Sequence, residues 1–170
     1  MSPVWPVPVR PRLKRFFDLR KQSRRFAVVA PTGCAASIIG GSTYHSMLNV
    51  NEFQTSDNPT AVSKAKEHLK SVDYIFLDEV SMISCRDLYR ISAKLTAISG
   101  KNDLPFGGFN IIFAGDFAQL PPVIGGQNAA LYGSLHNFAG NSASDQESAI
   151  GKALWHQVNI VVILRENMRQ

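Results

Sequence analysis

The sequence has few cysteines and no long hydrophobic run, and both absences exclude classes of protein. Two cysteines, Cys34 and Cys85, are too few for a disulfide framework or a four-ligand metal site. No apolar run approaches the roughly 20 residues of a membrane span. The small-residue cleavage site and apolar stretch of a secretory signal are absent as well. We therefore expect a protein that is not secreted and has no membrane span, in a reducing compartment.

Acidic residues are scarce at the N-terminus, where the positive charge is concentrated. The net charge is +5, and residues 1–25 hold eight of the 18 Lys and Arg residues against one acid, Asp18. Such a basic segment is compatible with nucleic-acid binding and also with a solvated helix face. Both interpretations stay open at this point.

Short apolar runs alternate with helical patterns along the chain. The length of 170 residues suits one domain. Residues 1–11 are proline-rich and predict an extended segment, so the domain is expected over 12–170. The alternation predicts an α/β fold with a parallel, doubly wound sheet. The expected strands are 26–30, 74–77, 109–114 and 160–164, and the expected helices are 13–25, 33–39, 58–70, 84–99 and 144–156.

Polar groups follow three of the expected strands at the point where each strand ends. Ligands bind at the carboxyl ends of the strands in such sheets, so these groups are candidates for a binding site. The groups are Pro31-Thr32-Gly33, Asp78-Glu79 and Gly115-Asp116 with Gln119.

The acidic pair is the strongest single signal. Asp78 and Glu79 follow four apolar residues, where unpaired charges would be costly to bury. Asp78 can hold the Mg²⁺ that bridges nucleotide phosphates, while Glu79 orients and deprotonates the attacking water. The alternative is an ordinary acidic pair that caps the next helix.

The sequence GDFAQLPP supplies a second candidate element. Asp116 can fix the loop, and the uncharged amide of Gln119 can detect a γ-phosphate. Pro121 and Pro122 stiffen the exit of the loop. The alternative is a proline-terminated turn with an exposed glutamine.

Four ordered segments carry a family resemblance that covers residues 12–170. Together they resemble the motifs of PIF-type DNA helicases of superfamily one, in particular the helitron and fungal branches. The resemblance implies a RecA-like motor domain that couples ATP hydrolysis, with Mg²⁺, to 5′-to-3′ DNA unwinding. The segments are APTGCAASIIGGSTYHS (30–46), YIFLDEVSM (74–82), PFGGFNIIFAGDFAQLPPV (105–123) and LRENMRQ (164–170).

The resemblance also assigns roles to individual residues. It implies that Asp78 binds Mg²⁺, Glu79 activates water, Gln119 senses the γ-phosphate and Arg169 stabilises charge on the transferred phosphoryl group. An arginine suits that last role because its charge is permanent and its donors form a planar fork.

A second set of residues is implied to contact single-stranded DNA. A glycine-bearing turn at a helix N-terminus presents backbone N–H groups to phosphate, which agrees with this assignment. The set comprises Pro31, Thr32, Gly33, Thr43 and His45.

The phosphate-binding loop G-x-x-x-x-G-K-[ST] of the family is missing. The Gly-Lys pairs at 100–101 and 151–152 lack the upstream glycine and the hydroxyl residue. We therefore expect an incomplete motor domain, a fragment that lacks this loop and the second motor domain and that does not unwind DNA alone.

Two other functions remain open besides an ATP-dependent DNA helicase. One is a non-catalytic remnant that binds single-stranded DNA through the basic segment and residues 31–45. The other is a RecA-like NTPase unrelated to helicase work, which the APTG and GDFAQLPP motifs argue against. The resemblance implies single-stranded or forked DNA and ATP as partners. It also implies roles in DNA repair, recombination or telomere maintenance, in the nucleus or the mitochondrion.

Overall fold

The central feature of the fold is a four-stranded, all-parallel sheet. The structure, a computed structural model, describes residues 9–49, 59–134, 140 and 142–164. The strand order is β2-β1-β3-β4, which confirms the predicted α/β class. The strands are β1 (Phe26–Ala30), β2 (Ser42–Thr43), β3 (Tyr74–Leu77) and β4 (Asn110–Phe113).

The strand register aligns the carboxyl ends of the strands. Val29 of β1 pairs with Leu77 of β3, which in turn pairs with Phe113 of β4. Ala30, the last residue of β1, pairs with Thr43, the last residue of β2. The segments that follow the four strands therefore leave the sheet at one edge.

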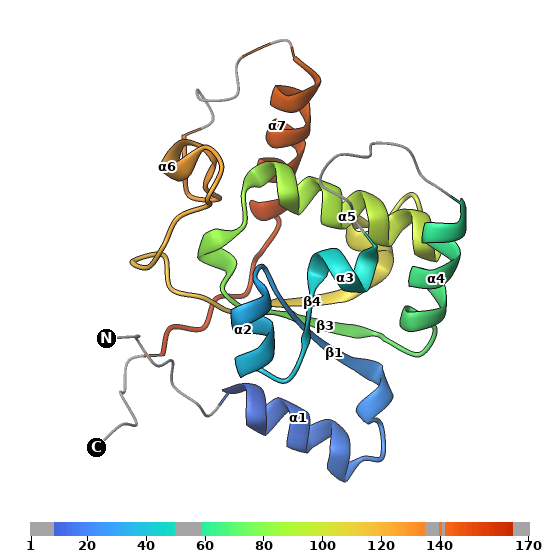
Figure 1. Cartoon of the computed structure of the whole chain (residues 1–170). Helices are drawn as coiled ribbons and strands as arrows, with labels where there is room; N and C mark the ends of the chain where they lie inside the picture. The colour runs from blue at the N-terminus through green and yellow to red at the C-terminus, as the bar shows by residue number, and fades with distance from the viewer. Residues whose placement is uncertain (1–8, 50–58, 135–139, 141, 165–170) are drawn as a thin grey trace.

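Helices cover both faces of the sheet (Figure 1). One face carries α1, whose Phe17 ring stacks 4.9 Å from Phe26. The other face carries α3, α4 and α5, and α5 buries Leu88 and Leu95 completely. The helices are α1 (Val9–Leu19), α2 (Gly33–Ile38), α3 (Tyr44–Leu48), α4 (Pro59–Leu69), α5 (Cys85–Ser99), α6 (Gly126–Ala129) and α7 (Ala143–Trp155). None of the helices within these described ranges is long and apolar enough to cross a membrane.

α7 packs directly on α5. A Cβ atom built on Gly151 would lie 1.8 Å from the carbonyl oxygen of Cys85, so only glycine allows this approach. The buried Lys152 donates its ammonium to the carbonyl of Leu131, which ties the segment after β4 to α7.

The N-terminal prediction was wrong in one respect. α1 begins at Val9 instead of residue 13, so residues 9–11 are helical and not extended. Pro11 is tolerated because it lies in the first turn, where a proline removes no intrahelical hydrogen bond. Residues 1–8 of the expected proline-rich segment lie outside the described part.

Two predictions near the C-terminal end were also wrong. The capping box of α7 uses Ser142 and Asp145 instead of Ser144 and Glu147. Residues 160–164 are not a strand, and their five side chains are 53–81% exposed. A β-prone sequence becomes a strand only when its backbone has a neighbouring strand to pair with, and the described residues provide none here.

Candidate nucleotide and nucleic-acid site

The turn after β3 is fixed to both neighbouring strands. The amide of Asp78 donates to the carbonyl of Val29 at 2.9 Å, and the amide of Val80 donates to that of Ala114 at 2.9 Å. Between them Glu79 adopts a left-handed conformation, with φ 54° and ψ 43°. A non-glycine residue in this region costs free energy and is held there only by its surroundings. The acidic pair therefore lies on a rigid turn.

The segment after β4 lies against that turn. A Cβ atom on Gly115 would lie 2.6 Å from Cγ1 and 2.8 Å from the amide nitrogen of Val80. The glycine therefore allows a close approach that any side chain would block. Through this contact the loop that carries Gln119 and the turn that carries Glu79 form one packed unit.

Burial and nearby charge act on Asp78 in opposite directions. The side chain is partly buried, and this burial raises its pKa above the ordinary value. A hydrogen bond of 3.0 Å from the amide of Glu79 and the positive charge of Arg10 lower the pKa, but burial is the larger effect. A cation bound at this carboxylate would offset the cost of its desolvation.

The acidic pair fits Mg²⁺ in the manner of nucleotide-dependent sites. In the described part of the chain no three His, Cys, Asp or Glu side chains are grouped to hold a metal ion. Mg²⁺ bound with a nucleotide needs only one or two carboxylates, because phosphates and waters complete its octahedron. Asp78 and Glu79 supply carboxylates of that number and kind.

Asp116 holds the loop after β4, as the sequence predicts. One carboxylate oxygen accepts the amide of Ala118 at 3.0 Å, and its backbone carbonyl accepts the amide of Gln119 at 3.0 Å. The side-chain amide of Gln119 lies 3.4 Å from the other oxygen, a long and weak bond. The glutamine can leave such a contact at little cost, and its role as a phosphate sensor stays a prediction.

The residues expected to contact DNA lie at or just after the carboxyl ends of β1 and β2. Thr32 and Thr43 are the N-caps of α2 and α3, and each hydroxyl accepts the backbone amide three residues on, at 3.2 and 3.1 Å. Gly33 is exposed and begins α2, while His45 stacks on Tyr44 with ring centroids 3.9 Å apart. Both threonines thus have a structural role, and their contact with DNA stays a prediction.

The strand register brings both sets of candidate residues to one edge. Asp78, Glu79 and Gln119 come after the carboxyl ends of β3 and β4. The expected DNA-contacting residues lie at or after the carboxyl ends of the neighbouring strands β1 and β2. Arg169 lies outside the described residues, so its assignment is untested.

Sequence reasoning missed two residues near the acidic pair. Arg10 belongs to α1, yet its charge acts on Asp78, and its guanidinium lies 3.5 Å from the carbonyl of Ile38. Ser81 is 1% exposed, and its hydroxyl has no hydrogen-bond partner among the described residues. A helical projection of residues 9–19 could have indicated on which side of the helix Arg10 lies. No sequence signal indicates that the hydroxyl of Ser81 is buried without a hydrogen-bond partner among the described residues.

These features define a class of protein. A parallel sheet with an acidic pair after one strand and a glutamine loop after its neighbour is the arrangement of a RecA-like motor domain. A family model described as "PIF1-like helicase" matches residues 14–170. The chain therefore belongs to the PIF1-like helicase family.

Individual relatives agree with this assignment. The ATP-dependent DNA helicase PIF1 of Emericella nidulans is 36% identical over 129 residues, which cover 72% of this chain and 17% of that protein. The Pif1 of Bdellovibrio bacteriovorus is 34% identical over 116 residues, covering 65% and 26%. The uncharacterised protein 030L of Invertebrate iridescent virus 6 is 32% identical over 154 residues, covering 86% and 27%.

Solved structures of the family show the same fold. The Pif1 helicase from Candida albicans matches with a TM-score of 0.57 and 30% identity, over 68% of this chain and 27% of that one. Bacteroides Pif1 bound to single-stranded DNA matches with a TM-score of 0.53 and 30% identity, over 67% and 27%. The chain thus spans about a quarter, or less, of the length of these relatives.

Proposed function

We propose that this chain provides the nucleotide-hydrolysing and DNA-contacting edge of the first motor domain of an ATP-dependent DNA helicase. The observation that carries the proposal is the contact of Gly115 with Val80, which joins the acidic turn to the glutamine loop. Such a joint unit can couple the state of a bound nucleotide to the structure around it. Its family membership and the single-stranded DNA bound to Bacteroides Pif1 support this function.

The proposed chemistry uses the acidic pair and the glutamine. When bound with the nucleotide, Mg²⁺ would neutralise charge on the phosphates, and Asp78 would hold it. Glu79 orients the attacking water and accepts its proton, while Gln119 contacts the γ-phosphate and Arg169 stabilises its charge. A structure of Bacteroides sp. Pif1 in complex with ADP-AlF4 matches this chain with a TM-score of 0.53, which supports a nucleotide site of this kind.

A chimera tests these roles. Residues 14–170 would replace the matching segment of Bacteroides Pif1, which restores the parts that this chain does not contain. We expect ATP hydrolysis that single-stranded DNA stimulates, and its loss by at least about 100-fold in Glu79→Gln, because a positioned base contributes about that much. The matched control is Glu67→Gln on α4, an exposed glutamate with the same change of charge, which should keep full activity. Equal rates in the two variants would refute the role of Glu79.

A missing sequence motif supports a second candidate function for the isolated chain. It contains no G-x-x-x-x-G-K-[ST] sequence, so the nucleotide phosphates lack their main backbone donors. We therefore propose that the 170-residue polypeptide alone binds single-stranded DNA without hydrolysing ATP. Binding that weakens steeply with salt and does not change with ATP would support this. DNA-stimulated hydrolysis by the isolated chain would contradict it.

The finer assignments rest on the family alone. We propose a 5′-to-3′ direction, forked DNA as a substrate and a role in DNA repair, recombination or telomere maintenance, in the nucleus or the mitochondrion. A structure of Pif1 named for unwinding at forked double-stranded DNA, matched with a TM-score of 0.51, supports the forked substrate. Strand displacement by the active chimera on forks of both polarities measures the direction directly.

A further inference from the structure

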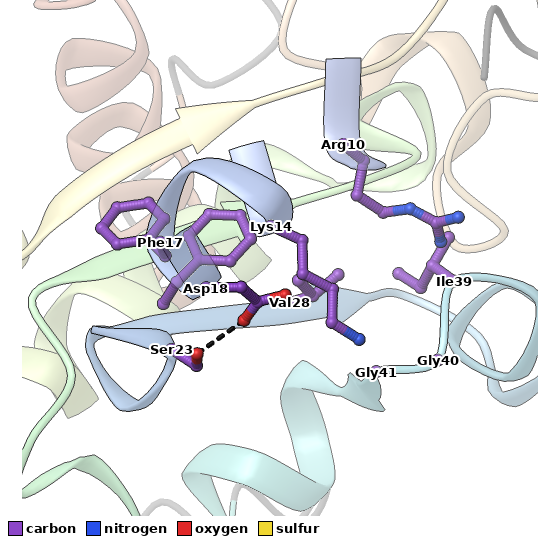
Figure 2. Close-up of a pocket in the computed structure, with 10 residues that line it drawn as sticks. Arg10, Lys14, Phe17, Asp18, Ser23, Val28, Ile39, Gly40 and Gly41 are labelled. Carbon is purple, nitrogen blue, oxygen red and sulfur yellow. Dashed lines mark hydrogen bonds between the residues drawn. The ribbon is translucent and has the colours of Figure 1, made fainter. Parts of the chain in front are cut away.

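A groove lies between α1 and the turn that follows α2. Its volume is about 150 Å³, and Val28 of β1 lines it. Arg10 and Lys14 line it from α1, and residues 39–41 line it from the turn. Figure 2 shows both basic side chains reaching from α1 toward that turn. We call this feature the α1 groove.

Among the described residues that line the α1 groove, the two cations Arg10 and Lys14 outnumber the one acid, Asp18. Arg10 makes one hydrogen bond to the described residues, the long contact of 3.5 Å with the carbonyl of Ile38, and Lys14 makes no hydrogen bond or ion pair with them. Asp18 lines the groove and accepts the hydroxyl of Ser23 at 2.5 Å, and the charge of Arg10 also acts on Asp78 outside the groove. Neither carboxylate is in an ion pair with a groove cation, so the groove favours an anion.

The helix geometry places Arg10 and Lys14 on the same side of α1, facing the groove. Residues four apart lie on one face of an α-helix, so Arg10 and Lys14 are neighbours there. Arg12 lies about 200° around the helix from Arg10 and points to the opposite side, since each residue advances about 100°. The concentration of charge in the groove is thus a property of two residues and not of the basic helix as a whole.

The turn opposite α1 packs closely on β1, and its backbone amides are already used in hydrogen bonds. Gly40 has a left-handed φ of 58°, and a Cβ atom on Gly41 would lie 2.4 Å from the carbonyl oxygen of Val28. The amides of both glycines already donate to α2 carbonyls, at 3.1 and 3.0 Å. The donors that remain for an anion are therefore the guanidinium and the ammonium.

We propose that the α1 groove binds a backbone phosphate of the DNA strand. The turn that lines it leads directly into β2, which ends at Thr43, one of the residues expected to contact DNA. An arginine and a lysine around a small cavity suit one phosphate group. The inference rests on the proposed function, because it takes the β1–β2 end of the sheet as the DNA-contacting end.

Salt titration of oligonucleotide binding tests the proposal with a matched control. The three proteins are the wild-type 170-residue chain, Lys14→Glu and Arg12→Glu, and the ligand is an oligothymidine of about 12 nucleotides. Lys14 and Arg12 are both exposed on α1, and both variants change the net charge equally. Each phosphate contact contributes about 0.7 to the slope of log affinity against log salt for a single strand.

We expect Lys14→Glu to weaken binding at least several-fold and to reduce that slope by about 0.7, as the loss of one phosphate contact predicts. Arg12→Glu should reduce the slope by clearly less than Lys14→Glu, because Arg12 points away from the groove. Coincident curves for the two variants would show that only the overall charge matters, and would overturn the groove as a site.

A second measurement separates failure of the groove from failure of the proposed function. The amide resonances of Gly40 and Gly41 are followed by NMR during titration with inorganic phosphate, ADP and the oligonucleotide. In one outcome the chain binds no oligonucleotide, while phosphate still causes saturable shifts in the wild type that are lost in Lys14→Glu. That result would support the phosphate site and contradict only the proposed DNA binding. No shift with phosphate in that case would overturn the inference. Shifts with ADP but not with the oligonucleotide would overturn the DNA strand as the source of the phosphate.

Discussion

Replacing Gly115 by alanine tests the contact that joins the two halves of the candidate nucleotide site. The added Cβ atom would lie 2.6 Å from Cγ1 and 2.8 Å from the amide nitrogen of Val80. Real Cβ atoms essentially never approach other atoms below 3.0 Å, so the loop after β4 or the turn after β3 must move. Overpacking of a closely fitted site costs about 1–3 kcal/mol of unfolding free energy.

The side chain of Val80 accounts for only part of that cost. In Gly115→Ala with Val80→Ala the contact with Cγ1 is removed, but the contact with the main-chain nitrogen remains. We therefore expect incomplete rescue, after allowance for the loss of the buried Val80 side chain itself. A double-mutant cycle measures the shared part, because both residues touch the same space.

Urea unfolding of the wild type and the variants provides the assay. The control is Gly33→Ala at the start of α2, where a Cβ atom meets nothing within 4 Å. That variant should change stability by less than about 1 kcal/mol, because it only restricts the unfolded chain. If Gly115→Ala were as stable as Gly33→Ala, with an equal slope against urea, the acidic turn and the glutamine loop would not be in contact.

Three further predictions concern single side chains. Burial raises the pKa of Asp78, so the folded chain loses stability as the pH rises through this raised pKa and the side chain becomes charged. Asp78→Asn should therefore raise the free energy of unfolding at pH 7 and give no gain below the ordinary pKa, as urea unfolding at several pH values would show. Ser81→Ala should leave stability unchanged or raise it by about 1 kcal/mol, because an unpartnered buried hydroxyl is removed, and a lower unfolding midpoint would reveal a partner for it. Cys34 is exposed, whereas Cys85 is buried and burial raises the pKa of its thiol, so a thiol reagent should label the native chain once and the unfolded chain twice.

The sequence pattern predicts the centre of the fold because the signals there are local. β1 and β3 are continuous apolar runs, β4 is apolar after Asn110, and α5 repeats apolar residues at helical spacing. β2 was missed because it has only two residues and both are polar. Residues 160–164 carry a strand-like sequence, but strand formation depends on a pairing partner elsewhere in the chain, which local propensity cannot reveal.

The candidate site was predictable to the same extent. The rule that ligands bind at carboxyl ends of parallel strands predicts Asp78 and Gln119 at one edge, and the register shows that β3 and β4, which precede them, end side by side. The approach of Arg10 to Asp78 and the contact of Gly115 with Val80 join segments far apart in sequence. Only tertiary packing determines such contacts, so they could not be predicted from the sequence.

The most direct test of the account is a cycle of hydrolysis rates for Glu79→Gln and Gln119→Ala in the chimera with Bacteroides Pif1. Residues that act as one unit on the same reacting phosphate are strongly non-additive. We expect the double variant to hydrolyse ATP no more slowly than the slower of the two single variants. Losses that simply multiply, with DNA stimulation retained in Gln119→Ala, would show that the glutamine loop and the acidic turn work independently.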